Sequence, residues 1–336
     1  MNSQATMQAA VIESIDGAPV LRELPRPVPG KGQVLVEVHA SGVNPLDLKI
    51  RAGKAAHAQH PLPAILGIDL AGVVCAVGPG VTDWSNGDEV FGMTGGVGGV
   101  QGSLAQYAAV DAALLARKPT GLGMRDAASL PLAFITAWEG LVDRAHVSHG
   151  MKVLVHGGAG GVGYMAIQIA TAAGAEVFTT VSAADIPLVE ARGAIAIDRH
   201  AQTPEQYLQA HTGGQGFDLV VDTVGGEVLD ASFKAVARFG HVVSALGWGT
   251  HALAPLSFRA GTYSGVFTLL PLLTGIGKEH HGEILREAAG MVDAGQLVAR
   301  VDPATFGLSS VNEAHERLQS SGNAGKIVVE VAHARH

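Results

Sequence analysis

The sequence predicts a two-domain α/β protein, with one small, partly closed β-barrel domain and one domain built on a doubly wound parallel sheet. The chain has 336 residues, which is too long for a single small core. Up to about residue 128 it reads as short strands separated by turn residues, and after Lys152 apolar strands alternate with helix-length segments. We therefore expect the barrel domain over 1–128, completed by about 273–336, and the parallel-sheet domain over 129–272.

Composition limits the partners that the chain can have. Charged residues make up 15% and hydrophobic residues 47%, and the formal net charge is -8 without any basic block. These values indicate a globular protein and argue against binding to nucleic acid or to an anionic membrane. A single cysteine, Cys75, rules out an intramolecular disulfide and leaves little scope for a cysteine-built metal site.

Targeting signals are not evident in the sequence. The N-terminal MNSQATMQAAV has no basic region followed by a long apolar core. The longest apolar stretch, GVFTLLPLL, is too short to span a bilayer. We expect a cytoplasmic protein.

The barrel domain is predicted from Val-rich or alternating runs that Gly, Pro, Asp and Asn separate. This spacing is typical of a small barrel. The expected strands cover 33–42, 71–80, 87–93 and 103–111.

The second domain is predicted from its regular alternation of strands and helices, which indicates a parallel sheet covered on both faces. A helix is expected over 124–145, with Asp126 near its start. The expected strands are 152–156, 176–181, 217–223, 240–246 and 265–270. Helices over 281–297 and 309–322 and a strand over 325–331 follow, and we expect this end of the chain to return to the first domain.

A glycine-rich loop marks the start of the second domain. Gly158, Gly160 and Gly163 fit the pattern G-x-G-x-x-G, with Gly161 and Val162 between them. An apolar strand leads in and a helix leads out, which is the context that a dinucleotide-binding loop requires. One glycine permits the tight turn, one removes a Cβ from the path of the pyrophosphate, and one lets the helix pack on the strand. The alternative is a glycine-rich turn without a ligand.

The end of the next strand bears on which dinucleotide binds. An NAD enzyme usually places an acidic residue there, against the adenosine ribose diol. Here Thr180 and Ser182 occupy the region, and the first carboxylate is Asp185. Arg199 or Arg192 could supply a cation for a 2′-phosphate, although either could equally be a solvated surface residue. We therefore expect NADPH as the cofactor.

Several segments together resemble the medium-chain dehydrogenase/reductase superfamily, and in particular its zinc-free quinone oxidoreductase branch. The resemblance covers nearly the whole chain. It implies a GroES-like barrel domain and a Rossmann domain. The segments are ASGVNPLDLKIRAG (40–53), LGIDLAGVVCAVGPGV (66–81), GDEVFG (87–92), VLVHGGAGGVG (153–163) and GKIVVEV (325–331).

The chain departs from the zinc-dependent members of this superfamily at the metal site. Those members place a cysteine where this chain has Asn44, a histidine where it has Ile68, and usually a cysteine near Leu132. These side chains make no tetrahedral zinc site. The resemblance thus implies metal-free hydride transfer from NADPH to an activated acceptor, such as a quinone or an α,β-unsaturated carbonyl.

The resemblance also implies roles for individual residues. Asn44 is expected to stabilise the negative charge that develops on the acceptor, or else to pin the loop before Pro45. Asp47 is expected to hold that loop through Lys49 or Arg51 and not to transfer protons directly. Thr136 is expected beside the nicotinamide, although it could bond back to its own helix.

Further cofactor contacts are carried over in the same way. Phe267, Thr268 and Leu269 match a family loop that lies against the nicotinamide carboxamide, although ordinary strand packing would also explain them. Leu246 and Lys326 are expected as additional cofactor contacts.

Two competing functions remain open at this stage: a reductase of another carbonyl or of an enoyl thioester, and a non-catalytic NADP(H)-binding redox sensor. H-x-x-H pairs occur at His57/His60, His146/His149 and His333/His336, but none has a carboxylate at helical spacing, so no metal site is expected. An exposed sheet edge near 265–270 would favour a homodimer.

Overall fold

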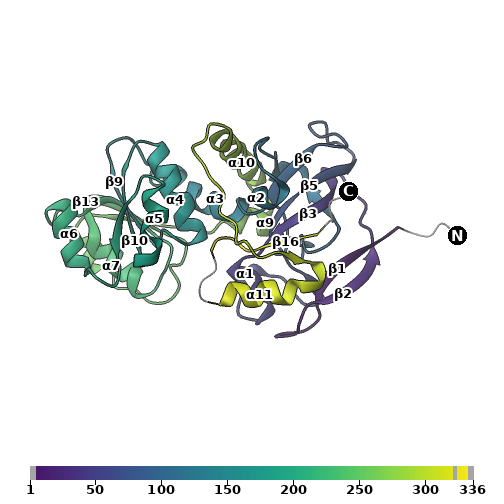
Figure 1. The fold of residues 1–336 in the computed structure, drawn as a ribbon, viewed down its shortest axis with the longest axis horizontal. Coiled ribbons are helices and arrows are strands. Elements are labelled where there is room, and N and C mark those ends of the chain that lie inside the picture. Colours follow the sequence, from purple (N-terminus) through teal and green to yellow (C-terminus); the bar gives the residue numbers. More distant parts are fainter. Residues whose placement is uncertain (1–4, 321–323, 332–336) are drawn as a thin grey trace. The chain divides into compact units, whose positions relative to one another are not determined.

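The computed structural model describes residues 5–320 and 324–331, and its described residues form two compact units. Unit 1 comprises Met1–Leu132 with Leu269–His336, and unit 2 comprises Ala133–Thr268. Figure 1 shows a parallel sheet with helices in unit 2, and a strand-rich unit 1 to which the C-terminal part of the chain returns. The predicted fold class is confirmed.

Unit 2 is built on a six-stranded sheet in the order β11-β10-β9-β12-β13-β14. Every strand pair in it is parallel. Numbered along the unit, this order is 3-2-1-4-5-6, the doubly wound order in which ligands bind at the carboxyl ends of the strands. The strands are β9 (Lys152–His156), β10 (Glu176–Val181), β11 (Ile195–Asp198), β12 (Phe217–Asp222), β13 (Val236–Ser244) and β14 (Thr262–Gly265).

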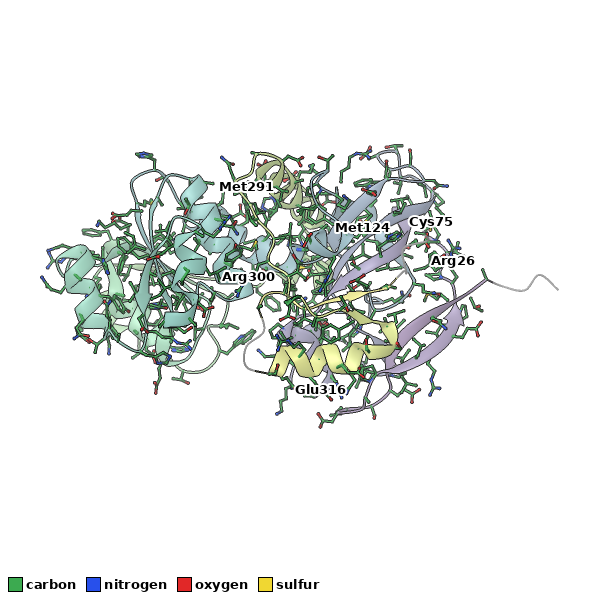
Figure 2. The ribbon with its side chains drawn as sticks, in the orientation of Figure 1. Arg26, Cys75, Met124, Met291, Arg300 and Glu316 are labelled. Atoms are coloured by element: carbon green, nitrogen blue, oxygen red, sulfur yellow. The ribbon has the colours of Figure 1, made fainter. Side chains whose placement is uncertain are left out.

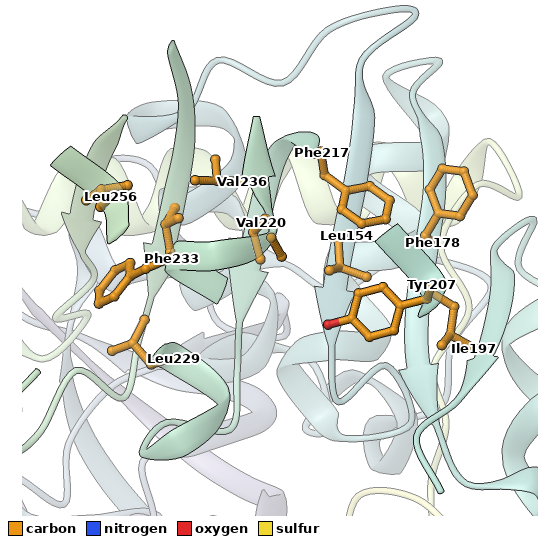
Figure 3. Packing of buried hydrophobic residues seen from close by; sticks show 12 residues of the cluster. Leu154, Phe178, Ile197, Tyr207, Phe217, Val220, Leu229, Phe233, Val236 and Leu256 are labelled. Atoms are coloured by element: carbon orange, nitrogen blue, oxygen red, sulfur yellow. The ribbon is translucent and has the colours of Figure 1, made fainter. Parts of the chain in front are cut away.

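Helices flank this sheet and bury one continuous apolar cluster. Phe217 is fully buried, and its ring centroid lies 5.2 Å from that of Phe178 and 6.4 Å from that of Tyr207 (Figure 3). These rings come from β10 and β12, the two strands on either side of β9, and from a covering helix, so they join the helical layer to the sheet. The helices are α3 (Pro131–Trp138), α4 (Gly161–Ala172), α5 (Ile186–Glu190), α6 (Pro204–Thr212), α7 (Glu227–Ala235) and α8 (Ala254–Ser257).

Unit 1 holds a three-stranded sheet in the order β2-β1-β4 and a seven-stranded sheet in the order β15-β16-β3-β5-β6-β8, with β7 paired to β3. The last strand, β16, pairs with β3 in antiparallel register, Val328 opposite Gly42. The C-terminal end of the chain thus belongs to the same sheet as β3. The strands are β1 (Thr6–Ile12), β2 (Val20–Pro25), β3 (Gln33–Gly42), β4 (Ala64–Ile65), β5 (Asp69–Val77), β6 (Glu89–Met93), β7 (Tyr107–Asp111), β8 (Leu115–Arg117), β15 (Phe306–Gly307) and β16 (Val328–Glu330).

Helices complete unit 1 and several of them pack against its strands. They are α1 (Pro45–Arg51), α2 (Met124–Ala127), α9 (Leu270–Thr274), α10 (Lys278–Asp293) and α11 (Val311–Gln319). Arg26 lies beside Cys75 (Figure 2), with its guanidinium 3.1 Å from the sulfur and stacked on the Tyr107 ring. The expected helix over 309–322 is shorter in the structure, and 321–323 lie outside the described residues.

The single helix expected over 124–145 is wrong. The structure has α2, a break, α3 and then a π-helical turn, Glu139–Arg144. The break precedes Pro131, whose ring disfavours helical backbone at the residue before it and which has no N–H to donate. The first helix begins after Gly123 rather than at Asp126.

The strand expected over 265–270 is also wrong. The sheet ends with β14, which stops at Gly265, and Leu270 begins helix α9. Pro271 fits the first turn of a helix, where its missing N–H is not needed. Since β14 is the last strand of its sheet, a sheet edge does lie close to residues 265–270. The pairing of this edge with a second copy across a two-fold axis stays a prediction.

Within residues 5–320 and 324–331, the structure contains no helix with the length and apolar character needed to cross a membrane.

Candidate functional site

The glycine loop lies between β9 and α4, at the carboxyl end of the parallel sheet. Gly157 has a φ of 77°, which glycine adopts without strain. A Cβ on Gly158 would lie 2.1 Å from the Thr179 hydroxyl, and one on Gly163 would lie 2.2 Å from the Gly157 carbonyl oxygen. These two glycines therefore let helix, turn and strand pack closely.

Gly160 and Gly161 have a different environment. A Cβ on Gly160 would meet only the Gly157 carbonyl oxygen, at 3.3 Å, and one on Gly161 only Ala133, at 3.8 Å. The protein thus leaves space in front of these residues, where α4 begins. The first N–H groups of a helix have no partner within the helix and carry a partial positive charge, so this space suits a phosphate group.

Thr180, which was expected to contact the cofactor, forms hydrogen bonds that hold the glycine loop. Its Oγ1 lies 3.3 Å from the Gly157 nitrogen, which donates to it, and 3.1 Å from Nδ1 of His156. Both side chains are buried. Burial lowers the pKa of His156 to about 4, so the imidazole is neutral at physiological pH. The threonine hydroxyl therefore positions the loop.

One cation and one carboxylate lie beside the end of β10. The Ser182 hydroxyl donates to the Asp185 carboxylate at 2.6 Å. The Arg199 backbone N–H donates to the Val181 carbonyl oxygen at 3.0 Å, which places Arg199 next to the same strand end with an exposed side chain. A ligand that reaches this point meets both charges.

A buried carboxylate, that of Asp222, organises the carboxyl ends of β12 and β13. Asp222 accepts hydrogen bonds from the backbone N–H groups of Val224 and Gly225 and from the Ser244 hydroxyl, at 2.7–3.2 Å. Ser244 Oγ in turn accepts the Leu246 N–H at 3.0 Å, which fixes the expected cofactor residue Leu246 at the carboxyl end of β13. Sequence reasoning missed Asp222, because an apolar strand that ends in aspartate is common.

Thr136, Thr268 and Glu139 form a polar group at the end of α3. The Thr268 hydroxyl lies 2.9 Å from the Glu139 carboxylate and 3.2 Å from the Thr136 hydroxyl. Glu139 begins the π-helical turn, a distortion that is frequent at functional sites. The sequence had indicated the two threonines but not the glutamate.

Phe267 and Leu269, the other two residues of the segment expected to lie against the carboxamide, do not share the surroundings of Thr268. The Phe267 ring is 37% exposed and meets the Trp248 ring edge to face, with centroids 6.5 Å apart. Leu269 is buried and belongs to unit 1.

In unit 1, Asn44 and Asp47 form the start of α1. Asn44 is the N-cap, Pro45 follows at the first helical position, and Asp47 accepts the Asn44 N–H at 2.7 Å. The other carboxylate oxygen of Asp47 accepts the Gly67 N–H at 3.1 Å. Asp47 thus joins α1 to the segment before β5 through two backbone N–H groups, and not through Lys49 or Arg51.

Asn44 also belongs to a buried charge cluster with Asp69 and Lys326. The Asn44 side-chain nitrogen donates to the Asp69 carboxylate at 2.9 Å and to the Gly42 carbonyl at 3.3 Å, while its oxygen accepts from the Lys326 ammonium. Lys326 also bonds to the Asp69 carboxylate at 2.9 Å. The second oxygen of Asp69 accepts the Leu132 N–H at 2.7 Å. Both N–H groups of the Asn44 amide are therefore committed within the cluster.

Burial is the main cause of the raised pKa of the Asp47 carboxyl. Desolvation raises the pKa of this carboxyl to about 6, against the opposing effect of its two backbone hydrogen bonds, and the charge of nearby Asp69 adds to the increase. The carboxyl is still largely ionised at neutral pH.

The residues at the family's metal position do not fit zinc. Ile68 is fully buried and offers no donor atom, the Asn44 amide is bound to Asp69, and Leu132 contributes only its backbone. Over the described ranges 5–320 and 324–331, no group of three His, Cys, Asp or Glu side chains could hold a metal ion. His333 and His336 lie outside the described residues.

Comparison with known proteins gives consistent family matches. Residues 30–120 match the alcohol dehydrogenase GroES-like domain, and residues 191–329 match the zinc-binding dehydrogenase family. The chain is 35% identical to the chloroplastic NADPH-dependent alkenal/one oxidoreductase of Arabidopsis thaliana, over 96% of this chain and 79% of the plant protein. It is also 35% identical to erythronolide synthase of Saccharopolyspora erythraea over 89% of its own length, and it spans 8% of that much longer protein.

Solved structures agree with these matches. An alcohol dehydrogenase superfamily protein from Novosphingobium aromaticivorans is 60% identical, with a TM-score of 0.96 and coverage of 97% of this chain and 100% of that one. The quinone oxidoreductase from Coxiella burnetii is 30% identical, with a TM-score of 0.83 and coverage of 98% and 100%.

The raised pKa of Asp47 predicts a specific pH dependence of stability. Between 3.8 and about 6, the folded protein retains a proton on Asp47 that the unfolded chain has lost. The contribution of Asp47 to the free energy of unfolding therefore falls as pH rises through this window. Denaturant titrations at several pH values give the free energy of unfolding as a function of pH. Its slope against pH in this window should be more negative for the wild type than for Asp47→Asn. The exposed-site variant Asp83→Asn should keep the wild-type slope, and equal slopes in all three proteins would contradict the assignment.

Proposed function

Because the chain belongs to the medium-chain dehydrogenase/reductase superfamily, in its quinone oxidoreductase-like branch, we propose that it is a zinc-independent, NADPH-dependent oxidoreductase that reduces a quinone or an α,β-unsaturated carbonyl. The observation that carries this proposal is the pairing of a complete dinucleotide loop with a metal position occupied by Asn44, Ile68 and Leu132. When bound, NADPH supplies the hydride. The chain's own residues hold the cofactor and stabilise charge on the acceptor.

The fit of the glycine loop to a pyrophosphate supports cofactor binding. Space is free in front of Gly160 and Gly161, and α4 presents its N-terminus there. Gly157 is fixed by the Thr180 hydroxyl, so the loop needs little reorganisation before it binds. Gly158, Gly163 and Val162 complete the loop.

The preference for NADPH depends on the balance of charge at the end of β10. In this proposal Arg199 faces the 2′-phosphate and the Asp185 carboxylate opposes it. The Ser182 hydroxyl donates to the phosphate only by giving up its hydrogen bond to Asp185. The NADPH dependence of the Arabidopsis relative supports this preference. Arginine binds phosphate through a planar fork of donors, so its contribution exceeds that of a hydroxyl.

The buried cluster of unit 1 supplies the polar chemistry that a metal would otherwise provide. Since the Asn44 amide is committed to Asp69 and Gly42, we assign it an orienting role toward Lys326 rather than direct contact with the acceptor. An ammonium has three donors, and Asn44 and Asp69 take two of them. The third remains for an anionic group of cofactor or acceptor.

Thr136 completes the proposed set of site residues. Thr268 links it to Glu139, so its hydroxyl is held in one orientation. We propose that Thr136, Thr268, Phe267 and Leu246 contact the nicotinamide half of the cofactor.

Substituting Gly160 tests the loop without disturbing the fold. Its backbone has a φ of -75° and a ψ of 165°, which any residue adopts, and the nearest protein atom to a new Cβ is 3.3 Å away. Gly160→Val should therefore fold normally but bind NADPH roughly a hundredfold more weakly, because the side chain takes the space of the pyrophosphate. Fluorescence titration measures the affinity. Gly121→Val, at a glycine with open space around it, is the matched control, and unaltered NADPH affinity in Gly160→Val would refute the placement of the pyrophosphate.

Cofactor preference is tested by a pair of substitutions with opposite expected effects. Arg199→Gln should lower the affinity for NADPH by roughly tenfold and leave that for NADH unchanged, because it removes the cation of the 2′-phosphate. Asp185→Asn should raise the affinity for NADPH, since it removes a repelling charge. If Arg199→Gln changes both affinities equally, the 2′-phosphate does not bind there.

The class of acceptor is tested by a substrate scan monitored through nicotinamide absorbance. We expect kcat/KM values for quinones or enones to exceed those for simple aldehydes and alcohols, because an acceptor without metal activation must itself be electrophilic. Enoyl thioesters form a separate arm of the scan. Preferential turnover of alcohols would contradict the proposal, and binding of NADPH without turnover of any acceptor would favour a sensor.

A further inference from the structure

A positively charged hollow lies at the amino-terminal edge of the parallel sheet in unit 2. Its volume is about 480 Å³. It is formed by the turn before β12, the last turn of α7, the start of β13 and the end of α8. The lining residues are Gly214, Gln215, Lys234, Arg238, Pro255, Phe258 and Arg259.

Most of the positive charge in this hollow is not balanced by the protein. None of the lining residues is acidic. Lys234 lies in the last turn of α7, where a cation is favourable, and Glu205 acts on it through space. The side chains of Arg238 and Arg259 form no hydrogen bond or ion pair with any residue in the described part of the chain. The hollow is therefore a local concentration of positive charge in a chain with a net charge of -8.

Each arginine has an exposed phenylalanine as its neighbour in sequence. Phe258 lines the hollow and is 85% exposed, and Phe239, next to Arg238, is 83% exposed. Phe239 also has a φ of 63°, which is an outlier for a bulky side chain. Its N–H donates to the Arg259 carbonyl oxygen at 2.8 Å, so one backbone bond fixes the two Arg–Phe segments side by side. Backbone strain and exposed aromatic rings together mark a surface that is organised for contact rather than for packing.

We propose that this hollow binds a small phosphorylated molecule with a flat ring, of the nucleoside polyphosphate class. Guanidinium groups match phosphate oxygens in a bidentate manner, and three cations suit more than one phosphate. The exposed Phe258 ring offers a stacking face for a base. A volume of this size lies within the usual range of small-molecule pockets, about 300–1,000 Å³.

This site is separate from the glycine loop. The loop follows the carboxyl end of β9, whereas the hollow lies where β12 and β13 begin. A strand of the length of β12 spans about 20 Å, so the two sites occupy opposite edges of one sheet. The inference therefore stands whether or not the proposed cofactor assignment is correct.

The test uses inorganic tripolyphosphate, ATP and adenosine as probes in calorimetric titrations of the full chain, with and without excess NADPH. We expect tripolyphosphate and ATP to bind, with affinities that fall as salt rises, and adenosine to bind far more weakly. Excess NADPH should leave tripolyphosphate binding unchanged. The double variant R238Q/R259Q should lose at least about tenfold in affinity for both anions.

Two further variants keep the test specific. R144Q/R286Q removes the same charge from exposed arginines elsewhere and should retain wild-type binding. Phe258→Ser should weaken the binding of ATP several-fold without changing the binding of tripolyphosphate, because only ATP carries a ring.

The inference is overturned if neither anion binds at millimolar concentration, if both double variants behave alike, or if NADPH displaces the bound anions. Thermal unfolding of each variant confirms that the comparison is made on folded protein.

Discussion

Burial of the Asp69 carboxylate is the constraint on which the chemistry of unit 1 depends. This group is fully buried, and an unpaired carboxylate there would be costly. It is satisfied by the Leu132 N–H, the Asn44 amide and the Lys326 ammonium, which come from three distant parts of the chain. The same bonds that stabilise Asp69 therefore hold Asn44 and Lys326 together in one organised set of polar groups.

In unit 2, hydrogen bonds to short polar side chains likewise hold the loops at the carboxyl ends of the strands. Thr180 holds the first residue of the glycine loop, and Asp222 holds the turn after β12 and, through Ser244, the segment after β13. Each short polar side chain replaces a backbone partner that the loop lacks. Loops that are fixed before a ligand arrives lose less entropy when it binds.

The sequence predicted best those features that depend on local patterns. Strands such as Gln33–Gly42, Lys152–His156 and Glu176–Val181 were found because apolar runs ended at turn residues, and the glycine loop because its spacing is tied to a strand and a helix. Asp69 and its partner Lys326 lie 257 positions apart, so no local pattern could pair them. The errors near Pro131 and Pro271 arose where apolar residues suit either a helix or a strand and proline decides between them.

The account depends most on hydride transfer without a metal ion, with the Asn44–Asp69–Lys326 cluster in the place of the ligands. Metal analysis of the purified protein, combined with assay of NADPH oxidation by an enone before and after exhaustive chelation, tests this directly. We expect less than stoichiometric zinc and an unchanged rate after chelation. A rate that is lost with the chelator and restored by one equivalent of zinc would contradict the account.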